Sequence, residues 1–197
     1  MKIGGFVKSS LVDYPGQVAA VIFTLGCAFR CPYCHNPQLV YPELFGEEIP
    51  LDMVLDFLEK RRGLLEGVVF CGGEPTLQDD LPEVARKVRS LGYSVKIDTN
   101  GSNPEILAEA LPYADYVAMD IKAPFGPDYA RVCGVTVDDF DIRRSMLLLR
   151  SSGVRYHFRT TFHPDYLPAE RAGEIKAVLG GGERYIVQYA SVPRKRR

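Results

Sequence analysis

Three cysteines lie in the stretch Leu25-Gly26-Cys27-Ala28-Phe29-Arg30-Cys31-Pro32-Tyr33-Cys34-His35-Asn36, at the spacing C-x-x-x-C-x-x-C. In an irregular loop this spacing lets three thiolates converge on one metal centre, and thiolates suit zinc and iron–sulfur clusters. A closed zinc site needs a fourth ligand, for which the candidates are His35, strained by its place next to Cys34, and the distant Cys71. Three free core cysteines are the remaining alternative. We favour a [4Fe–4S] cluster with three cysteine ligands, because the iron left without one is open to another molecule.

Length and composition bound the class of protein. The chain has 197 residues, enough for one domain with a sizeable core. Its net charge of −1 provides no overall field for nucleic acid or a membrane, apart from a basic tail at 191–197 that we expect to be solvated. The longest apolar stretch is shorter than the roughly 20 residues of a membrane span, and we expect no secretory signal, because no charged segment followed by an apolar one is seen at the start. An odd number of cysteines, three of them crowded, favours a reducing cytoplasm over a secreted disulfide scaffold.

Strand and helix patterns alternate along the chain. Six apolar runs rich in β-branched residues predict strands, at 18–25, 67–71, 94–98, 116–121, 154–161 and 184–189. Amphipathic or capped segments between them predict helices, at 51–62, at 81–91, from Pro104 onward, at 138–151 and at 168–179. This alternation predicts a parallel α/β sheet with right-handed crossovers. Residues 1–17 are expected to form a short extension, with a tight turn at Asp13-Tyr14-Pro15-Gly16.

Polar motifs follow the predicted strands at the points where they end. They are the cysteine loop, Gly72-Gly73-Glu74, Asp98-Thr99-Asn100-Gly101, Asp120 with Lys122, Arg159 with His163, and Gln188. In parallel α/β folds and barrels the functional site is built at the carboxyl ends of the strands. We therefore expect these side chains at one rim, and this argument is independent of the cysteine spacing.

Each of these motifs also has a simpler structural explanation. Two glycines after a strand often form a tight turn, Asn100-Gly101 is a common turn pair, and Asp98 could cap the turn that follows it. Lys122 could be an ordinary surface lysine. Their joint placement at one rim favours a shared site. Cys71 and Cys133 belong to no further C-x-x-C group, so each is expected to pack as a small apolar residue.

The cysteine pattern, with Tyr33 as the aromatic residue before the third cysteine, resembles the first signature of the radical S-adenosylmethionine (SAM) superfamily. Gly72-Gly73-Glu74-Pro75 resembles its second signature, which contacts the methionine amino group of SAM. The segment Ser10-Leu11-Val12-Asp13-Tyr14-Pro15-Gly16 and the motif at 98–101 are similar to the glycyl-radical activating enzymes, most closely to the activators of anaerobic ribonucleoside-triphosphate reductase. The resemblance runs from about residue 3 to residue 122 and thins beyond.

The resemblance implies a role for each residue that matches a motif. Cys27, Cys31 and Cys34 would ligate three irons of a [4Fe–4S] cluster, and the amino and carboxylate groups of SAM would chelate the fourth. The backbone around Tyr33 would lie by the adenine. Gly72 and Gly73 would let the main chain approach the ligand, because a Cβ would obstruct it. Glu74 would accept hydrogen bonds from the methionine ammonium.

The other matched residues would line the rest of SAM. Asp98, Thr99 and Asn100 match positions on the ribose and methionyl side, and Asp120 and Lys122 match an Asp-x-Lys that reaches SAM in the formate-lyase activator. Asp98, Thr99 and Asp120 also match a monovalent-cation site of that relative. The formate-lyase activator has a SAM-contacting histidine near the sixth strand, where this chain has Gln188. Either Gln188 substitutes for that histidine or the contact is absent. His163 is either a rim residue or an ordinary loop residue.

The expected fold is a partial, open (β/α)6 barrel of the radical SAM type, with 1–197 as a single domain. A full eight-stranded barrel takes about 250 residues, and the lateral gap of an open barrel can admit a loop of a large protein.

The implied activity is reductive cleavage of SAM to a 5′-deoxyadenosyl radical, which takes a hydrogen atom from the Cα of a glycine on a partner enzyme. That partner is expected to be anaerobic ribonucleotide reductase, with flavodoxin or ferredoxin as electron donor, and no catalytic side chain beyond the cluster and SAM is implied. The alternatives are a radical SAM enzyme for another peptide or a small molecule, and a non-catalytic iron–sulfur electron-transfer or zinc-stabilised binding protein.

Overall fold

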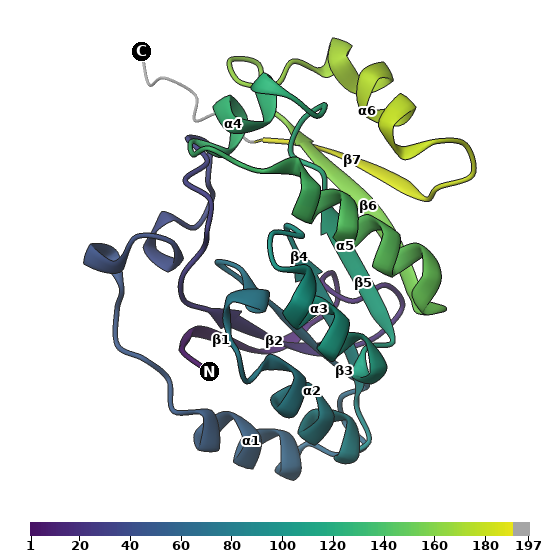
Figure 1. The fold of residues 1–197 in the computed structure, drawn as a ribbon. Coiled ribbons are helices and arrows are strands. Elements are labelled where there is room, and N and C mark those ends of the chain that lie inside the picture. The colour runs from purple at the N-terminus through teal and green to yellow at the C-terminus, as the bar shows by residue number, and fades with distance from the viewer. Residues whose placement is uncertain (191–197) are drawn as a thin grey trace.

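The computed structural model of the chain describes residues 1–190, so the basic tail expected at 191–197 lies outside the described residues. Seven strands form one sheet in the order β1 to β7 (Figure 1). The strands are β1 (Ile3–Ser10), β2 (Ala19–Thr24), β3 (Gly67–Gly72), β4 (Ser94–Thr99), β5 (Tyr116–Asp120), β6 (Arg155–Phe162) and β7 (Tyr185–Tyr189). The α-helices are α1 (Leu51–Lys60), α2 (Leu81–Ser90), α3 (Pro104–Ala110), α4 (Pro127–Cys133), α5 (Asp139–Ser152) and α6 (Ala172–Leu179).

The direction of the strands follows from their connections. Each strand from β2 to β7 runs parallel to the next, and each of these connections contains a helix, because parallel neighbours need a crossover. β1 runs antiparallel to β2. Within residues 1–190 the two edge strands, β1 and β7, do not pair with each other, so the sheet stays unclosed. The predicted partial, open (β/α)6 barrel is confirmed, with one antiparallel strand added at its edge.

Residues 1–17 differ from the short extension that the sequence predicted. Ile3–Ser10 forms β1, and the residues after it form a loop that returns the chain to β2. The strand was missed because Gly4 and Gly5 lower strand propensity and only Ile3 among its residues is buried, which leaves no alternating pattern. A tight turn lies one residue later than the predicted one, over residues 14–17 with Pro15 and Gly16 at its centre, since the Gln17 N–H donates to the Tyr14 carbonyl at 3.2 Å.

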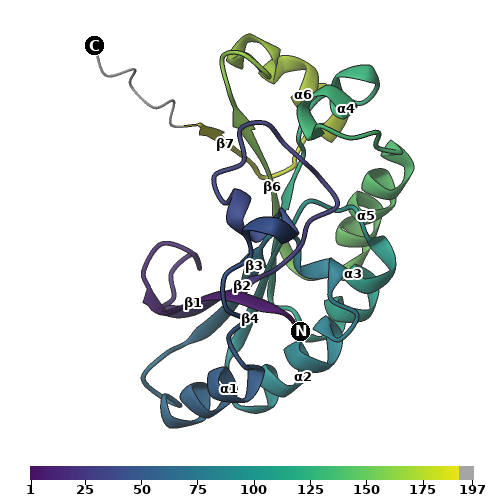
Figure 2. The same cartoon turned by 90° about the vertical axis from the view of Figure 1, so that its left-hand side faces the viewer.

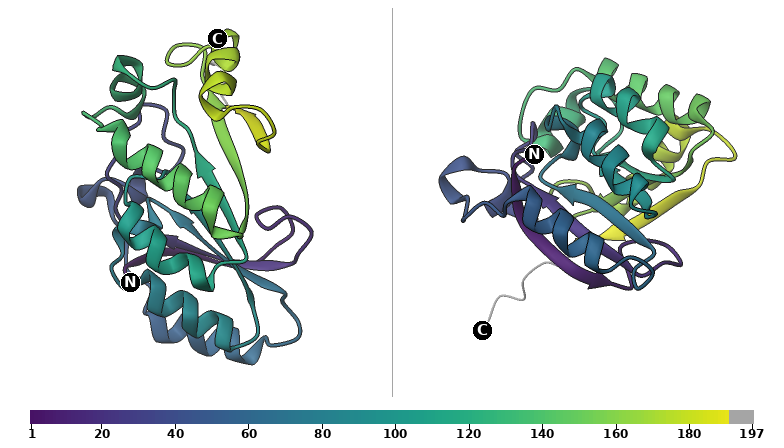
Figure 3. Two further views of the ribbon diagram at one scale, coloured as in Figure 1. Left: turned by 45° about the vertical axis from the view of Figure 1, so that its right-hand side comes forward. Right: turned by 90° about the horizontal axis from the view of Figure 1, so that it is seen from below.

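The sheet has a helical face and a concave face, because successive side chains of a strand point to opposite sides. Helices α1, α2, α3 and α5 lie along one face (Figure 2), and most of the apolar core packs between them and the sheet. The concave face carries a smaller apolar cluster of Tyr14, Ala19, Val21, Val69 and Tyr116. The loop between β1 and β2 lies on the side of the sheet away from the helices (Figure 3).

Local signals place the ends of several helices. Asn103 accepts the Ile106 N–H at 3.3 Å, which confirms it as the N-cap of α3, and Asp138 caps α5 by accepting the Phe140 N–H at 2.9 Å. Helix α4 was not predicted, because seven residues show too little periodicity. None of the helices in residues 1–190 combines the length and the apolar content of a bilayer span.

Candidate active site

A cavity of about 440 Å³ opens at the carboxyl ends of the parallel strands. Its wall contains every residue that the sequence predicted to hold a cluster or SAM, namely Cys27, Cys31, Tyr33, Cys34, Gly72, Gly73, Glu74, Asp98, Thr99, Asn100, Asp120 and Lys122. These residues follow β2, β3, β4 and β5, whose carboxyl ends meet at one rim because the strands are parallel. The structure brings the predicted residues together, and their individual roles stay predictions.

The loop after β2 is held in place by its own backbone and by α4. The Cys34 N–H donates to the Cys31 carbonyl at 3.0 Å, and the Arg30 N–H donates to the Cys133 carbonyl at 2.7 Å. Gly134, directly after α4, lies so close that a Cβ on it would be 2.2 Å from the Arg30 carbonyl oxygen. A helix from far later in the chain therefore supports the cysteine loop.

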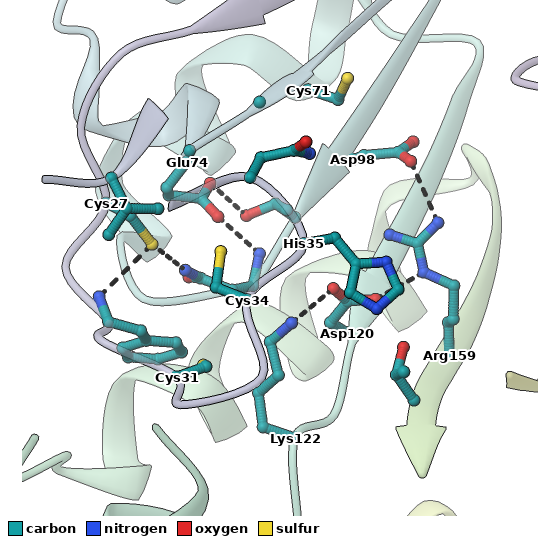
Figure 4. A pocket seen from close by; sticks show the side chains of 18 of the residues that line it. Cys27, Cys31, Cys34, His35, Cys71, Glu74, Asp98, Asp120, Lys122 and Arg159 are labelled. Carbon is teal, nitrogen blue, oxygen red and sulfur yellow. Dashed lines mark hydrogen bonds and ion pairs between the residues drawn. The ribbon is translucent and has the colours of Figure 1, made fainter. Parts of the chain in front are cut away.

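The donor set suits an iron–sulfur cluster. Cys27, Cys31 and Cys34 are free thiols on the wall of one cavity. The Cys27 sulfur accepts the Phe29 N–H at 3.4 Å and a side-chain N–H of Asn100 at 3.5 Å (Figure 4). Hydrogen bonds to ligand sulfurs are one of the means by which proteins tune such clusters. The residues present therefore fit a cluster with three cysteine ligands.

The same arrangement suits a single zinc ion less well. Zinc ligands surround one ion at about 2.0–2.3 Å, so they crowd together. Within residues 1–190, no three His, Cys, Asp or Glu side chains are close enough to hold one metal ion. His35 and Cys71, the two candidates for a fourth zinc ligand, both line the cavity without completing such a group.

The thiols differ in acidity because their surroundings differ. Burial, together with the charge of Glu74, raises the pKa of Cys27 to about 12. A hydrogen bond with the Cys133 thiol outweighs burial and lowers the pKa of Cys31 to about 7. Cys133 is fully buried, as expected of a small apolar residue, but only the fold reveals its contact with Cys31. Cys71 is half-buried, packs against the concave apolar cluster and lines the cavity.

Gly72 and Gly73 are required by the protein's own backbone. A Cβ on Gly73 would lie 2.0 Å from the Gly26 carbonyl oxygen, and a Cβ on Gly72 would lie 2.3 Å from the Thr24 backbone nitrogen. Gly72 also has a φ of +116°, a conformation that residues with side chains rarely adopt. The sequence predicted glycines here for the approach of a ligand, whereas the crowding that the structure shows comes from β2 and the start of the cysteine loop.

Glu74 is buried and has four hydrogen-bond donors around its carboxylate. Oε1 accepts the Thr76 N–H at 3.1 Å and the hydroxyls of Thr76 and Thr99, each at 2.7 Å, while Oε2 accepts the Asn100 N–H at 2.6 Å. Burial raises the pKa of Glu74, and these donors oppose the rise. Only Oε2 has a free lone pair for a further donor. The sequence analysis did not identify Thr76 as a site residue. The signal that could have identified it is its position two residues after Glu74.

Five charged side chains of alternating sign cross the ends of β4, β5 and β6 in the order Lys96, Asp98, Arg159, Asp120 and Lys122 (Figure 4 shows the last four). Arg159 reaches Asp98 at 3.1 Å and Asp120 at 2.5 Å, and the Lys122 ammonium reaches Asp120 at 2.7 Å. Burial opposes the charge of Asp120, but Arg159 and Lys122 outweigh it and hold the pKa of this carboxyl well below its usual range. Asp120 in turn overcomes the effect of burial on Lys122 and raises the pKa of its ammonium.

Arg159 lines the cavity although the sequence assigned it no role. Its guanidinium pairs with both Asp98 and Asp120, two of the residues that the resemblance matches to a monovalent-cation site. The third, Thr99, donates its hydroxyl to Glu74. The available signal was the position of Arg159 near the end of a parallel strand, where it is in register with Asp120 on β5.

Gln188 and His163 take different places. Gln188 lines the cavity, and its Oε1 accepts the Thr161 hydroxyl at 3.3 Å. The ring of His163 packs against Tyr33, with 5.6 Å between ring centroids, and against Tyr166, with 5.0 Å. His163 therefore packs against the cysteine loop. Of His163 and Gln188, only Gln188 lines this cavity.

Comparison with known proteins agrees with this geometry. A family model described as the radical SAM superfamily matches residues 21–179. A Methanocaldococcus jannaschii protein named "Putative glycyl-radical enzyme activating enzyme" is 36% identical over 94% of this chain and 78% of its own length. The pyruvate formate-lyase-activating enzyme of Clostridium pasteurianum is 32% identical over 71% of this chain, which spans 60% of that enzyme.

A solved structure shares the fold at low sequence identity. SuiB of Streptococcus suis, solved with S-adenosylmethionine bound, superposes with a TM-score of 0.69 and 18% identity. The superposition covers 89% of this chain and 41% of SuiB. At this identity the likeness concerns the fold.

Proposed function

Because the chain belongs to the radical SAM superfamily, we propose that it is a glycyl-radical activating enzyme. Its proposed cofactors are SAM and one [4Fe–4S] cluster held by Cys27, Cys31 and Cys34. When bound, the cluster and SAM supply a carbon-centred radical that removes a hydrogen atom. The proposed target of that radical is the Cα of a glycine on a partner enzyme, and the partner that the sequence resembles most is anaerobic ribonucleoside-triphosphate reductase.

One observation carries the proposal. The cysteine loop meets the ends of β3, β4 and β5 at a single cavity, so three thiols face a buried carboxylate and a set of paired charges. A cluster alone would need no such wall of polar side chains beside it. The similarity to two activating enzymes, one of them matched over nearly the whole chain, supports the same activity.

The charges at the cavity match the methionyl part of SAM. Glu74 offers Oε2 to an ammonium group, and Lys122 offers an ammonium to a carboxylate. Asp120 lies against Lys122 at 2.7 Å and keeps it charged, because an adjacent anion raises the pKa of a lysine. We propose that the backbone around Tyr33 lies by the adenine and that Asp98, Thr99 and Asn100 line the ribose and methionyl side of SAM.

An open side of the barrel suits a macromolecular substrate. The sheet ends at β1 on one side and at β7 on the other, and the cavity wall includes residues near both edges, Asp13 after β1 and Gln188 on β7. A loop of a large protein could reach the radical through this gap. We propose that residues 1–197 act as one radical SAM domain in a reducing cytoplasm, with flavodoxin or ferredoxin as electron donor.

Anaerobic reconstitution tests the proposal. We expect iron and sulfide in a 1:1 ratio, about four of each per chain, and an electron paramagnetic resonance spectrum of the reduced protein that changes when SAM is added. Incubation with anaerobic ribonucleotide reductase should then produce 5′-deoxyadenosine together with a glycyl radical signal on the reductase. A cluster whose spectrum ignores SAM would point to plain electron transfer. Cleavage of SAM with no glycyl radical on the reductase or on any other glycyl-radical enzyme would refute the activase function.

A further inference from the structure

Two neighbouring aliphatic side chains, Leu11 and Val12, stand almost fully in solvent at the loop between β1 and β2. Their exposed fractions are 77% and 88%, the two highest values among the large apolar residues of the described part of the chain. Exposed apolar residues scattered singly are ordinary on protein surfaces, whereas adjacent ones at a projecting position mark contact sites more often. The loop projects on the side of the sheet away from the helices (Figure 2).

The backbone under this pair is held by hydrogen bonds within the turn. The Ser10 hydroxyl donates to Asp13 at 2.5 Å and accepts the Val12 N–H at 3.2 Å. Tyr14, two residues after Val12, is 1% exposed and packs on the concave face with its ring 6.2 Å from that of Tyr116. A loop fixed in this way loses little conformational entropy when a partner binds.

The chain downstream of the pair is fixed to β3 as well. A Cβ on Gly67 would lie 2.9 Å from the Tyr14 ring and 2.8 Å from the Gln17 side-chain oxygen, so the loop packs directly on that strand. The Val18 N–H donates to a carboxylate oxygen of Glu66 at 2.7 Å, and the Glu66 N–H donates back to the Val18 carbonyl at 2.8 Å. Leu11 and Val12 are therefore presented by an anchored turn.

The same loop borders the cavity. Asp13, the residue directly after Val12, lines the cavity together with Cys71 and Gln188. A molecule seated on Leu11 and Val12 would thus lie beside the opening through which a protein loop must enter. If the hydrogen donor is a backbone Cα, the surface that carries it has to contact whatever borders that opening.

We propose that Leu11 and Val12 form a docking anchor for the partner enzyme, inserting into an apolar depression beside its glycine-bearing loop. The proposal rests on the proposed function, because it takes the substrate to be a folded protein. An aliphatic side chain that a partner covers is removed from water, and this burial contributes to affinity in proportion to the apolar area buried. The anchor would therefore act on the affinity for the partner and leave the chemistry at the cavity unchanged.

The test is the double variant L11S/V12S, compared with M53S/L147S. Met53 and Leu147 are exposed to a similar degree, 62% and 61%, and lie on α1 and α5 of the helical face. Activation of the partner is followed by its glycyl radical signal at varied partner concentration, with dithionite as the reductant. We expect L11S/V12S to raise the KM for the partner about 10- to 100-fold and M53S/L147S to change it less than about 2-fold.

Formation of 5′-deoxyadenosine without partner reports on the site itself, and it should be unchanged in both variants. The milder L11A/V12A, with an expected smaller rise in KM, replaces L11S/V12S if the latter loses this uncoupled activity. An unchanged KM, or an equal change in the control, would overturn the docking proposal while leaving the activase function standing. A change in oligomeric state in sedimentation, confined to the Leu11 and Val12 variants, would overturn it in favour of a second copy of this chain. If the wild-type protein activates no glycyl-radical enzyme, the proposed function fails first.

Discussion

Replacing Gly73 with alanine is expected to destabilise the protein strongly, because the space for a Cβ is already filled by backbone. That Cβ would lie 2.0 Å from the Gly26 carbonyl oxygen and 2.9 Å from the Leu39 carbonyl oxygen. Carbon contacts are favourable at about 3.5–4.0 Å, so the cysteine loop would have to move by more than about 1 Å.

The magnitude follows from what that movement breaks. The Gly26 carbonyl accepts the Glu74 N–H at 2.8 Å, and the Gly26 N–H donates to the Leu39 carbonyl at 2.7 Å. Losing two hydrogen bonds costs about 1 kcal/mol each, and overpacking adds about 1–3 kcal/mol. The gain from a stiffer unfolded chain, about 0.4–1 kcal/mol, offsets only part of this loss. We expect the free energy of unfolding to fall by about 3 kcal/mol, which in a chain of this size lowers Tm by about 10 °C.

The assay is urea unfolding of the reduced protein followed by circular dichroism, with Gly46→Ala as the matched control. Gly46 has no atom within 4 Å of the position of its Cβ, so the same chemical change should alter the free energy of unfolding by less than about 1 kcal/mol. Iron content after anaerobic reconstitution should also fall in Gly73→Ala, since the displaced loop carries the first cysteine of the triad. If the two variants unfold within about 1 kcal/mol of each other, the argument from backbone crowding is wrong.

Three further predictions concern the site and the concave face. Cys31→Ala should abolish cluster binding and SAM cleavage, whereas Cys71→Ala should retain both in iron, sulfide and 5′-deoxyadenosine assays; full cleavage by Cys31→Ala would exclude it as a ligand. Arg159→Met should lower the free energy of unfolding by about 2 kcal/mol, since it removes the shared cation of two half-buried carboxylates. Arg159→Lys should recover part of that loss. Equal stability of the wild type and both variants would contradict the pairing. Burial, with the charges of Arg159 and Lys96, lowers the pKa of His157 to about 4, below its unfolded value of about 6.5. The folded protein therefore favours the neutral ring. The stability that His157 contributes is lost as the pH falls from 6.5 toward 4. Between pH 7 and pH 5 wild type should therefore lose about 1–2 kcal/mol more than His157→Gln in urea unfolding, and parallel losses would show that His157 does not titrate in this range.

The fold class could be predicted from the sequence because its signals are local. Parallel strands that are buried on both faces leave nearly continuous apolar runs. The helices between them leave 3.6-residue periodicity, so six of the seven strands were found. β1 was not, since two glycines and five exposed or half-exposed neighbours break its pattern. Its place in the sheet depends on pairing with β2, which is a property of the tertiary structure.

The membership of the site was also predictable, because parallel strands end at a common rim. Each motif could be assigned to that rim from the strand that precedes it. The contacts among the motif residues were not predictable in the same way. Glu74 accepts from Thr99 and Asn100, which are 25 and 26 residues away, and no local pattern specifies such a pair.

By itself, then, the sequence determined the alternation of strands and helices and the edge of the sheet at which the three thiols and the polar residues gather. Only the tertiary structure decided that Arg159 joins Asp98 and Asp120 across separations of 61 and 39 residues. It also decided that the Cys133 thiol contacts Cys31, and that residue 73 must be glycine because the Gly26 backbone packs against it. The physical reason is that spacing and periodicity act over a few residues, whereas charge pairing and close packing depend on which distant segments the folded sheet brings into contact.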